Sequence, residues 1–264
     1  MADPLNGSRA KVQRAKEHFQ GLIIAHAQFM NLNPHGFVID ENPETGERIW
    51  RARISRETPV EWRVVAGDVV HNLRAALDFL AYQLWVANGK KGTTEDDIMF
   101  RVARFREAAK IEAAKSRVKK ELGPTAAAIW DRLQPYRAGD GYERHPLYVL
   151  HELDIWDKHR LLNVVWYAVQ SYEGFIGGPG ENVHIEHFAG LTTAAVHGPL
   201  TDGAELQRLT LGESTPNVQM NFKFTFHVTF EQGGPGKGEP LLKTLDQLVS
   251  FVDETITLFA PLLA

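Results

Sequence analysis

The sequence predicts an α+β protein in which a bundle of helices packs with an antiparallel β-sheet. Apolar residues recur at helical spacing through most of residues 8–165, and a last apolar stripe follows Pro240. Between these regions, apolar and polar residues alternate from Val218 to Phe230, as in a strand with one buried face. Because helices dominate the first two thirds and strands the last third, the order favours α+β.

Start and stop signals bound the predicted helices. Thr58 can cap a helix that begins at Pro59, and Asn88-Gly89 is a typical helix end. Similar signals predict helices at 8–30, 59–88, 104–134, 145–165 and 240–263, with a break at Gly123-Pro124 and a loop at 136–144. The last helix returns to the bundle, so residues 1–264 are predicted to form a single domain, helical at 1–165 and 240–264.

The predicted sheet occupies residues 166–231, the C-terminal third apart from the closing helix. Within it, strands are expected at 166–176, 183–188, 207–211 and 218–231, separated by glycine-rich turns. A separate hairpin is predicted near the N-terminus. There, residues 37–40 and 48–54 flank a turn that contains Pro43 and Gly46.

Composition narrows the class of protein. The hydrophobic content of 44% and the charged content of 23% are typical of a soluble globular chain, and the net charge of −4 provides no global basic field for nucleic acid. The absence of cysteine excludes disulfides, thiolate metal sites and cysteine nucleophiles. We find neither a signal peptide nor an apolar run of the roughly 20 residues that span a bilayer. We therefore expect a cytoplasmic protein without membrane contact.

The stretch from His145 to Val165 stands out because apolar residues surround its charged ones. Read as a helix, it has leucines and other apolar residues at most angles, so it is predicted to be buried nearly all round. Its seven ionisable residues are His151, Glu152, Asp154, Asp157, Lys158, His159 and Arg160. Because buried charges require partners, a polar network is expected here.

The second helix carries the expected partner of this network. His71, Arg74 and Asp78 lie on one face, whereas an apolar stripe occupies another. Two helices that each present His, Asp and a cation could face one another. Such a network can simply lock the register of the two helices, or it can form a functional site.

Three chemistries are compatible with these residues, and whether the protein is an enzyme stays open. The residues that could ligate zinc, iron or manganese are His71, Asp78, His151, Asp154 and His159, although no His-Glu-x-x-His motif occurs. Metal-free phosphodiester cleavage would use a histidine as acid or base and a cation on the phosphate. A plain anion-binding module would use Arg74, Lys158 or Arg160 as a clamp.

The motifs Gly-Asp-x-x-His-Asn-Leu-Arg-x-Ala-Leu-Asp at 67–78 and Glu-Leu-x-x-x-Asp-Lys-His-Arg at 152–160 resemble those of an uncharacterised bacterial protein family. This resemblance implies a bacterial origin and no particular activity. The second helix also resembles HEPN-type helical domains, many of which are metal-independent ribonucleases marked by Arg, four to six residues, then His. Arg74 has this spacing, but the chain has Phe79 where the histidine is expected, so His71 or His151 would have to replace it.

These observations define a candidate site and its expected partners. The candidate site residues are His71, Arg74, Asp78, His151, Asp154, Asp157, Lys158 and His159. The expected partner is an anionic small molecule, with RNA as the alternative, and a homodimer is left open. A basic segment at 101–120 could contact phosphates, although such a face is more often simply solvated. His184 and His187 do not share a face of their strand, which argues against a metal site there.

Overall fold

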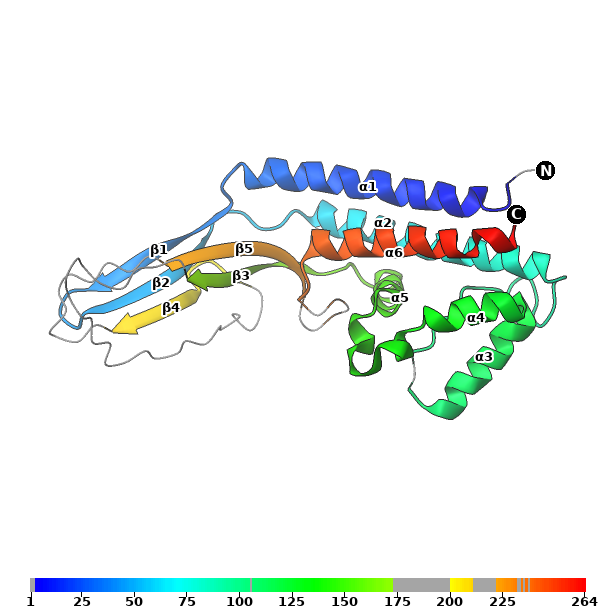
Figure 1. The fold of residues 1–264 in the computed structure, drawn as a ribbon. Coiled ribbons are helices and arrows are strands. Elements are labelled where there is room, and N and C mark those ends of the chain that lie inside the picture. The colour runs from blue at the N-terminus through cyan, green and yellow to red at the C-terminus, as the bar shows by residue number, and fades with distance from the viewer. Residues whose placement is uncertain are drawn as a thin grey trace.

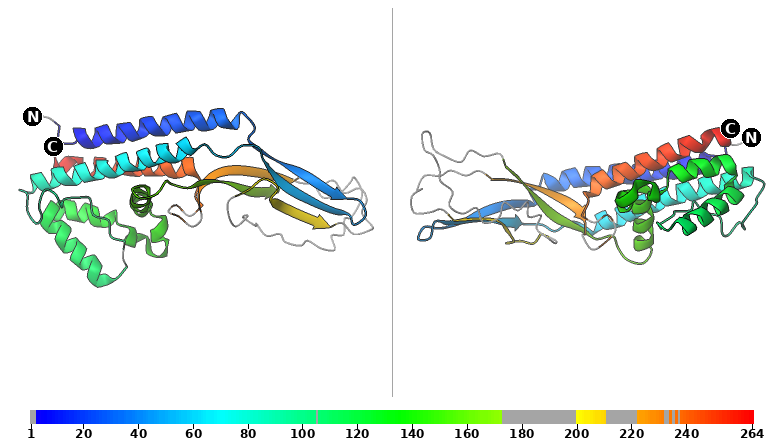
Figure 2. Two further views of the ribbon diagram at one scale, coloured as in Figure 1. Left: turned by 180° about the vertical axis from the view of Figure 1, so that it is seen from behind. Right: turned by 60° about the horizontal axis from the view of Figure 1, so that its bottom comes forward.

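The computed structural model describes residues 3–104, 106–172, 200–210, 222–231, 234, 236 and 238–264. The molecule is elongated, with helices at one end and strands at the other (Figure 1). Both chain termini lie at the far end of the helical part, and the same arrangement is seen from behind and from below (Figure 2). The predicted α+β class, with a helical bundle, antiparallel strands and a closing helix, is confirmed.

Six α-helices and two short 3₁₀ segments are present among the described residues. They are α1 (Asn6–Met30), α2 (Val60–Ala87), α3 (Ala108–Leu122), α4 (Pro124–Arg132), η1 (Pro135–Arg144), α5 (Pro146–Asp157), α6 (Leu241–Phe259) and η2 (Ala260–Leu262). Helix α2 is the centre of the bundle, since it contacts α1, α3, α5 and α6. Its buried apolar face explains this position, and the residues that are at most 2% exposed include Ala66, Val69, Val70, Leu73, Ala76, Leu77, Leu80, Ala81 and Leu84.

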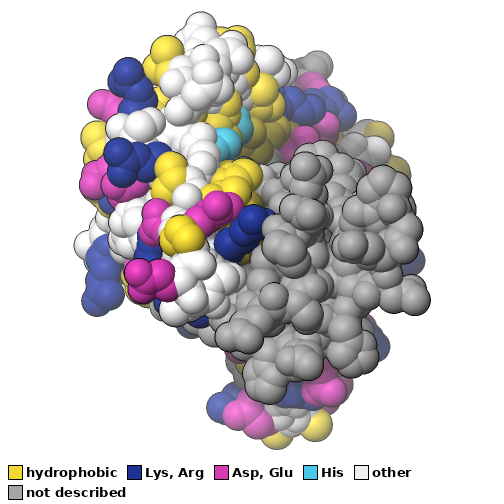
Figure 3. All heavy atoms as spheres, turned by 90° about the vertical axis from the view of Figure 1, so that its left-hand side faces the viewer, with side chains coloured by type: hydrophobic (Ala, Val, Ile, Leu, Met, Phe, Trp, Pro, Cys, Tyr) yellow, Lys and Arg dark blue, Asp and Glu magenta, His cyan; other side chains and the backbone are white. Residues whose placement is uncertain are grey.

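The described strands form two antiparallel sheets. Strands β1 (His35–Asn42), β2 (Glu47–Ile54) and β4 (Glu205–Thr210) make one sheet in the order β1-β2-β4, and β3 (Val164–Tyr172) pairs with β5 (Phe222–Phe230) in the other. Strand β4 of the C-terminal third therefore pairs with β2 of the N-terminal hairpin. Figure 3 looks onto this end of the molecule, where charged side chains of both signs are interspersed with hydrophobic ones on the described part of the face.

Aromatic packing joins the strands to the helices. The ring of His35 on β1 stacks on Phe226 of β5 at 4.5 Å between centroids and meets Trp166 of β3 edge-on at 5.0 Å. On the helical side, Phe29 of α1 lies 6.2 Å from Trp166 and 5.2 Å from Trp62 of α2. The buried hydrophobic residues consequently form one cluster that continues from the bundle into both sheets.

Several predicted boundaries were wrong. Helix α5 ends at Asp157 rather than at residue 165, because Val164 and Val165 pair with Phe230 and Thr229 of β5. Pro59, not Thr58, occupies the N-cap position of α2, and the Thr58 hydroxyl donates to the Val164 carbonyl at 3.2 Å instead. The helix expected from residue 104 begins at Ala108, and the loop expected at 136–144 forms the 3₁₀ segment η1. The strand predicted at 183–188, with His184 and His187, lies outside the described residues.

Candidate functional site

The contact between α2 and α5 brings a buried carboxylate next to a lysine and a histidine side chain. Asp154 on α5 is only 2% exposed. One of its oxygens, Oδ2, lies 2.7 Å from Nζ of Lys158, and the other, Oδ1, lies 3.5 Å from Nδ1 of His71 on α2. The His71 and Lys158 side chains are 60% and 54% exposed, so both side chains that contact the buried carboxylate lie mostly at the surface of the molecule.

A second part of the site surrounds Arg74, which is 6% exposed. Its Nη2 donates to the Phe100 carbonyl at 2.7 Å and lies 2.9 Å from Oδ1 of Asp78. The Phe100 N–H in turn donates to the same carboxylate oxygen at 2.8 Å. Burial raises the pKa of Asp78, while Arg74 and the Phe100 N–H oppose that shift. These contacts fix one end of the guanidinium and leave Nη1 buried without a hydrogen-bond partner among the described residues.

His151 on α5 provides a second buried nitrogen without a partner. Its Nδ1 is buried and makes no hydrogen bond within the described part of the chain. Burial, together with the positive charges of Arg74 and Arg104, lowers the pKa of His151 to about 4. The imidazole is therefore neutral at neutral pH. Because the charge of Arg74 acts on His151, the two unpartnered nitrogens belong to one electrostatic neighbourhood.

Asp157, the last residue of α5, lies against α2 at Gly67. A Cβ atom at position 67 would lie 2.4 Å from Oδ1 of Asp157, so only glycine allows this approach. Burial raises the pKa of Asp157, and the nearby charges of Asp154 and Asp68 raise it further. No described residue donates a hydrogen bond to this carboxylate. Gly67 and Asp68, which begin the motif at 67–78, therefore lie close to Asp157 of the motif at 152–160.

The remaining predicted residues are more exposed than the sequence suggested. Among the seven ionisable residues between His151 and Arg160, only Asp154 is buried, which corrects the expectation of a segment buried nearly all round. The reason is that α5 ends at Asp157, so Lys158, His159 and Arg160 lie in an exposed turn. The guanidinium of Arg160 lies 5.0 Å above the Trp156 ring, and His159 joins none of the contacts between α2 and α5.

The predicted metal ligands do not converge on one point. Across the residues that the structure describes, which include His71, Asp78, His151, Asp154 and His159, no group of three or more His, Asp or Glu could hold a metal ion. The contacts instead pair Asp78 with Arg74 and the Phe100 N–H, and Asp154 with Lys158, whereas Asp157 has no donor among the described residues. The arrangement can therefore bind an anion through its nitrogens or transfer a proton through His71.

The basic segment at 101–120 is largely neutralised by carboxylates. Six of its eight cations form ion pairs, namely Arg101, Arg104, Arg106, Lys110, Lys115 and Arg117. The most buried of these pairs centres on Glu121, which is 1% exposed and was not singled out from the sequence. Since most of these charges are already compensated, the segment offers little free positive charge to RNA.

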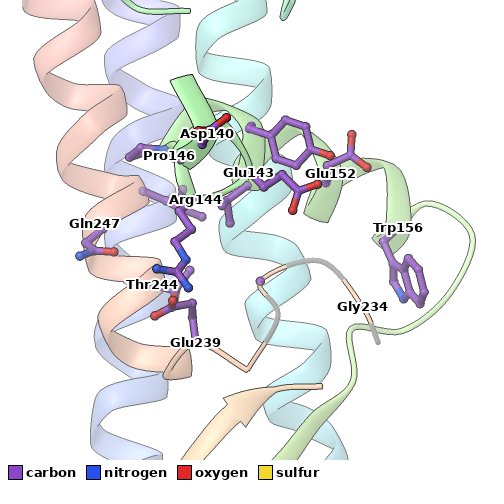
Figure 4. A pocket seen from close by; sticks show the side chains of 15 residues that line it. Asp140, Glu143, Arg144, Pro146, Glu152, Trp156, Gly234, Glu239, Thr244 and Gln247 are labelled. Carbon is purple, nitrogen blue, oxygen red and sulfur yellow. The ribbon is translucent and has the colours of Figure 1, made fainter. Parts of the chain in front are cut away.

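A cavity of about 830 Å³ opens on another face of α5 (Figure 4). Its lining comes from η1, α5, α6 and the segment before α6, and includes Arg144, Tyr148, Glu152, Trp156, Glu239 and Thr244. Sequence reasoning missed this cavity, because its residues are dispersed over about a hundred positions. The available signals were the glycine-rich turn at 233–236 and a tryptophan at the end of a short helix.

Comparison with protein-family models, with curated proteins and with solved structures gives no match to this chain. The geometry of its own residues is therefore what indicates a function. In the described part of the molecule, no helix is both long enough and apolar enough to cross a membrane.

Proposed function

We propose that the protein binds a small anionic molecule at the contact between α2 and α5, through Arg74 and His151. One observation carries this proposal: Nη1 of Arg74 and Nδ1 of His151 are both buried and have no hydrogen-bond partner among the described residues. A buried polar group without a partner costs about 1–3 kcal/mol, and more when the group is charged. An anionic oxygen that accepts from both nitrogens would remove this cost.

The surroundings of Arg74 suit it to this role. Asp78 and the Phe100 carbonyl hold Nη2, which orients the guanidinium and leaves Nη1 free. The neutral His151 ring can carry its proton on Nδ1 and donate it to the ligand. Arg104, which is held by Glu152 at 3.0 Å, adds a further positive charge close enough to shift the pKa of His151. Both half-buried residues, Asp78 and His151, connect the site to solvent.

Sulfate is a suitable probe because it stays fully ionised between pH 5 and 8. We expect sulfate to raise the melting temperature more than sodium chloride of equal ionic strength does, because binding to the native state stabilises it. Its affinity should rise as the pH falls from about 7 to 5, since the bound anion favours protonated His151.

The Arg74→Lys variant keeps the positive charge but removes the free Nη1 donor. We expect it to weaken sulfate binding by about tenfold or more, while the exchange Arg132→Lys on the exposed end of α4 leaves binding unchanged. A sulfate effect no larger than that of chloride in the wild type would contradict the proposal. In that case a water molecule would satisfy the two nitrogens.

A metal-independent ribonuclease is the second candidate, and the pairing of His71 with Asp154 favours it. A buried carboxylate beside Nδ1 of an exposed imidazole orients the other nitrogen outward, as in many acid–base sites. His71 would take the proton of the ribose 2′-hydroxyl as this oxygen attacks the phosphorus, the leaving 5′ oxygen would take a proton from water, and Lys158 would contact the phosphate. His151 is less suitable, because its low pKa makes it a weak base.

The nuclease reading predicts that purified protein cleaves single-stranded RNA in the presence of EDTA. His71→Gln should lower the rate by a factor of about 10² to 10⁴, whereas His159→Gln, on an exposed residue outside the α2–α5 contacts, should not. No cleavage by the wild type, or equal loss in both variants, would eliminate this candidate and leave the anion-binding proposal unaffected.

A further inference from the structure

The cavity on α5 contains charges that the contact between α2 and α5 does not use. Glu152 and Trp156 line the cavity from one side of α5, while Asp154 faces α2 from another. Two carboxylates of the cavity wall are already ion-paired, Asp140 with Arg106 and Glu152 with Arg104. Its remaining polar groups therefore decide what it could bind.

Arg144 and Glu239 line this cavity with opposite charges, and neither forms an ion pair with any described residue. Figure 4 shows the Arg144 side chain reaching toward Thr244 and Glu239. The backbone holds Glu239 in place, since its carbonyl accepts from the Phe230 N–H at 3.0 Å and its N–H donates to Gly236 at 2.8 Å. Two neighbouring charges of opposite sign that stay unpaired can serve a ligand that carries both signs.

A third polar group sits beside these two charges. Thr244 of α6 is only 6% exposed, and its side chain lines the cavity. Its hydroxyl has no hydrogen-bond partner in the described part of the chain. This hydroxyl is therefore free to donate to a ligand atom in the cavity.

We propose that this cavity binds a small molecule with an α-amino-acid head group. The ligand carboxylate would accept hydrogen bonds from the Arg144 guanidinium and the Thr244 hydroxyl, and the adjacent ammonium would pair with Glu239. In such a head group the two charges are separated by a single carbon atom, which suits a guanidinium and a carboxylate that line the same cavity and point toward one another in Figure 4.

The rest of the cavity is suited to an apolar ligand body. Its wall includes Tyr148, Val149, Trp156 and the buried Leu248. The Arg160 guanidinium, 5.0 Å from the Trp156 ring, covers that ring and helps to hold it in place. A volume of about 830 Å³ exceeds what a single amino acid fills, so the site could also take a larger molecule that ends in this head group.

Three probes of nearly the same shape test the proposal by isothermal titration calorimetry. They are L-phenylalanine, phenethylamine, which lacks the carboxylate, and 3-phenylpropanoate, which lacks the ammonium. We expect L-phenylalanine to bind with a Kd of about 1 mM or tighter, and at least about tenfold more tightly than either analogue. Equal binding of one analogue and L-phenylalanine would overturn the proposal, as would no binding of L-phenylalanine at about 10 mM.

Three substitutions assign the head group to its partners. Arg144→Gln and Glu239→Gln should each weaken L-phenylalanine binding by about tenfold or more, and the isosteric Thr244→Val by about threefold to tenfold. Arg132→Gln, an exposed arginine outside the cavity, is the matched control and should bind as the wild type does. Unchanged melting temperatures would show that the variants are folded. Binding that survives both Arg144→Gln and Glu239→Gln would overturn the proposal.

Discussion

Glu121 and Asp154 are buried to nearly the same degree, at 1% and 2% exposed, and each carboxylate contacts two nitrogen-bearing side chains. At Glu121, Arg101 donates to both oxygens at 2.7 Å and Arg117 adds a third bond at 2.8 Å. At Asp154, Lys158 lies at 2.7 Å but His71 only at 3.5 Å. The first carboxylate is fully satisfied, whereas the second depends on two side chains that are mostly in solvent.

This difference separates a structural ion pair from a candidate site. The Arg101 side chain is only 18% exposed, so its guanidinium is held in one geometry against Glu121. The Lys158 and His71 side chains can leave Asp154 for water or for a ligand at little cost, because more than half of each is already solvated. Near Asp154, Arg74 and His151 each also have a buried nitrogen without a hydrogen-bond partner among the described residues, whereas Glu121 is surrounded by paired groups. A buried charge therefore suggests function only when its partners are free to exchange.

The largest expected effect is at Glu121. Replacing it by Ala leaves the partly buried Arg101 without its acceptor, and breaking a buried ion pair typically costs about 3–5 kcal/mol. Urea unfolding of Glu121→Ala should show a loss in this range. Glu112→Ala, on an exposed partner of Lys115, is the control and should stay within about 0.5 kcal/mol of the wild type. A loss below about 1 kcal/mol at Glu121 would remove the contrast with Asp154.

A smaller loss is expected at Asp154, although the carboxylate is equally buried. Asp154→Ala should lower the free energy of unfolding by about 2 kcal/mol, because Lys158 and His71 regain solvent when the carboxylate is removed. Urea unfolding under the conditions used for Glu121→Ala gives the comparison directly. If Asp154→Ala costs as much as Glu121→Ala, then the two carboxylates are equivalent structural partners.

The sequence predicted the helices and strands that have strong local signals. It failed where pairing with a residue far along the chain decides the secondary structure. The central helix α2 and strand β5 were recognisable from periodicity and from their end signals. Val164 and Val165 fit a helical apolar pattern equally well, and only their pairing with β5, more than 60 positions away, assigns them to a strand. The partnership between the N-terminal hairpin and β4 spans an even longer separation, so no local pattern could indicate it.

The candidate site was predictable in part for the same reason. Helical spacing placed His71, Arg74 and Asp78 on one face of α2, and the structure brings that helix against Asp154 of α5. The role of Phe100 between Arg74 and Asp78 could not be read from the sequence, because a backbone carbonyl and N–H leave no signature in residue type. Likewise, the pairing of Arg104 with Glu152 joins residues 48 positions apart, so no local pattern in 101–120 indicates it.

The contact between α2 and α5 is tested next through Gly67. Gly67→Ala would place a Cβ 2.4 Å from Oδ1 of Asp157, so we expect a loss of about 1–2 kcal/mol from overpacking. The double variant with Asp157→Ala should recover most of that loss. Gly21→Ala in α1, where nothing lies within 4 Å, is the control and should be neutral or slightly stabilising in thermal unfolding. A Gly67→Ala protein as stable as the wild type would mean that the two helices are not in this close contact.

The smallest change in the free energy of unfolding is expected from Asp157→Asn. The raised pKa of Asp157 predicts whether this change is stabilising and how it varies with pH. Burial and the charges of Asp154 and Asp68 raise the pKa of Asp157 in the folded protein. A carboxyl with a raised folded-state pKa contributes stability that is complete below the unfolded pKa, about 3.9, and is lost as the pH rises through the folded value. At pH 7 the ionised side chain therefore opposes folding, and an uncharged amide of similar shape should relieve this repulsion.

We expect Asp157→Asn to stabilise the protein at pH 7, by at most about 1 kcal/mol because the side chain is only half-buried. The gain should shrink as the pH falls toward 4 and vanish well below the unfolded pKa of about 3.9, where the wild-type carboxyl is protonated in both states. Denaturant melts of both proteins from pH 4 to pH 8 measure this difference. The Asp154→Ala background is a further control, since removal of the neighbouring charge should reduce the gain. An Asn variant that is less stable than the wild type at pH 7 would mean that ionised Asp157 stabilises the fold as Glu121 does.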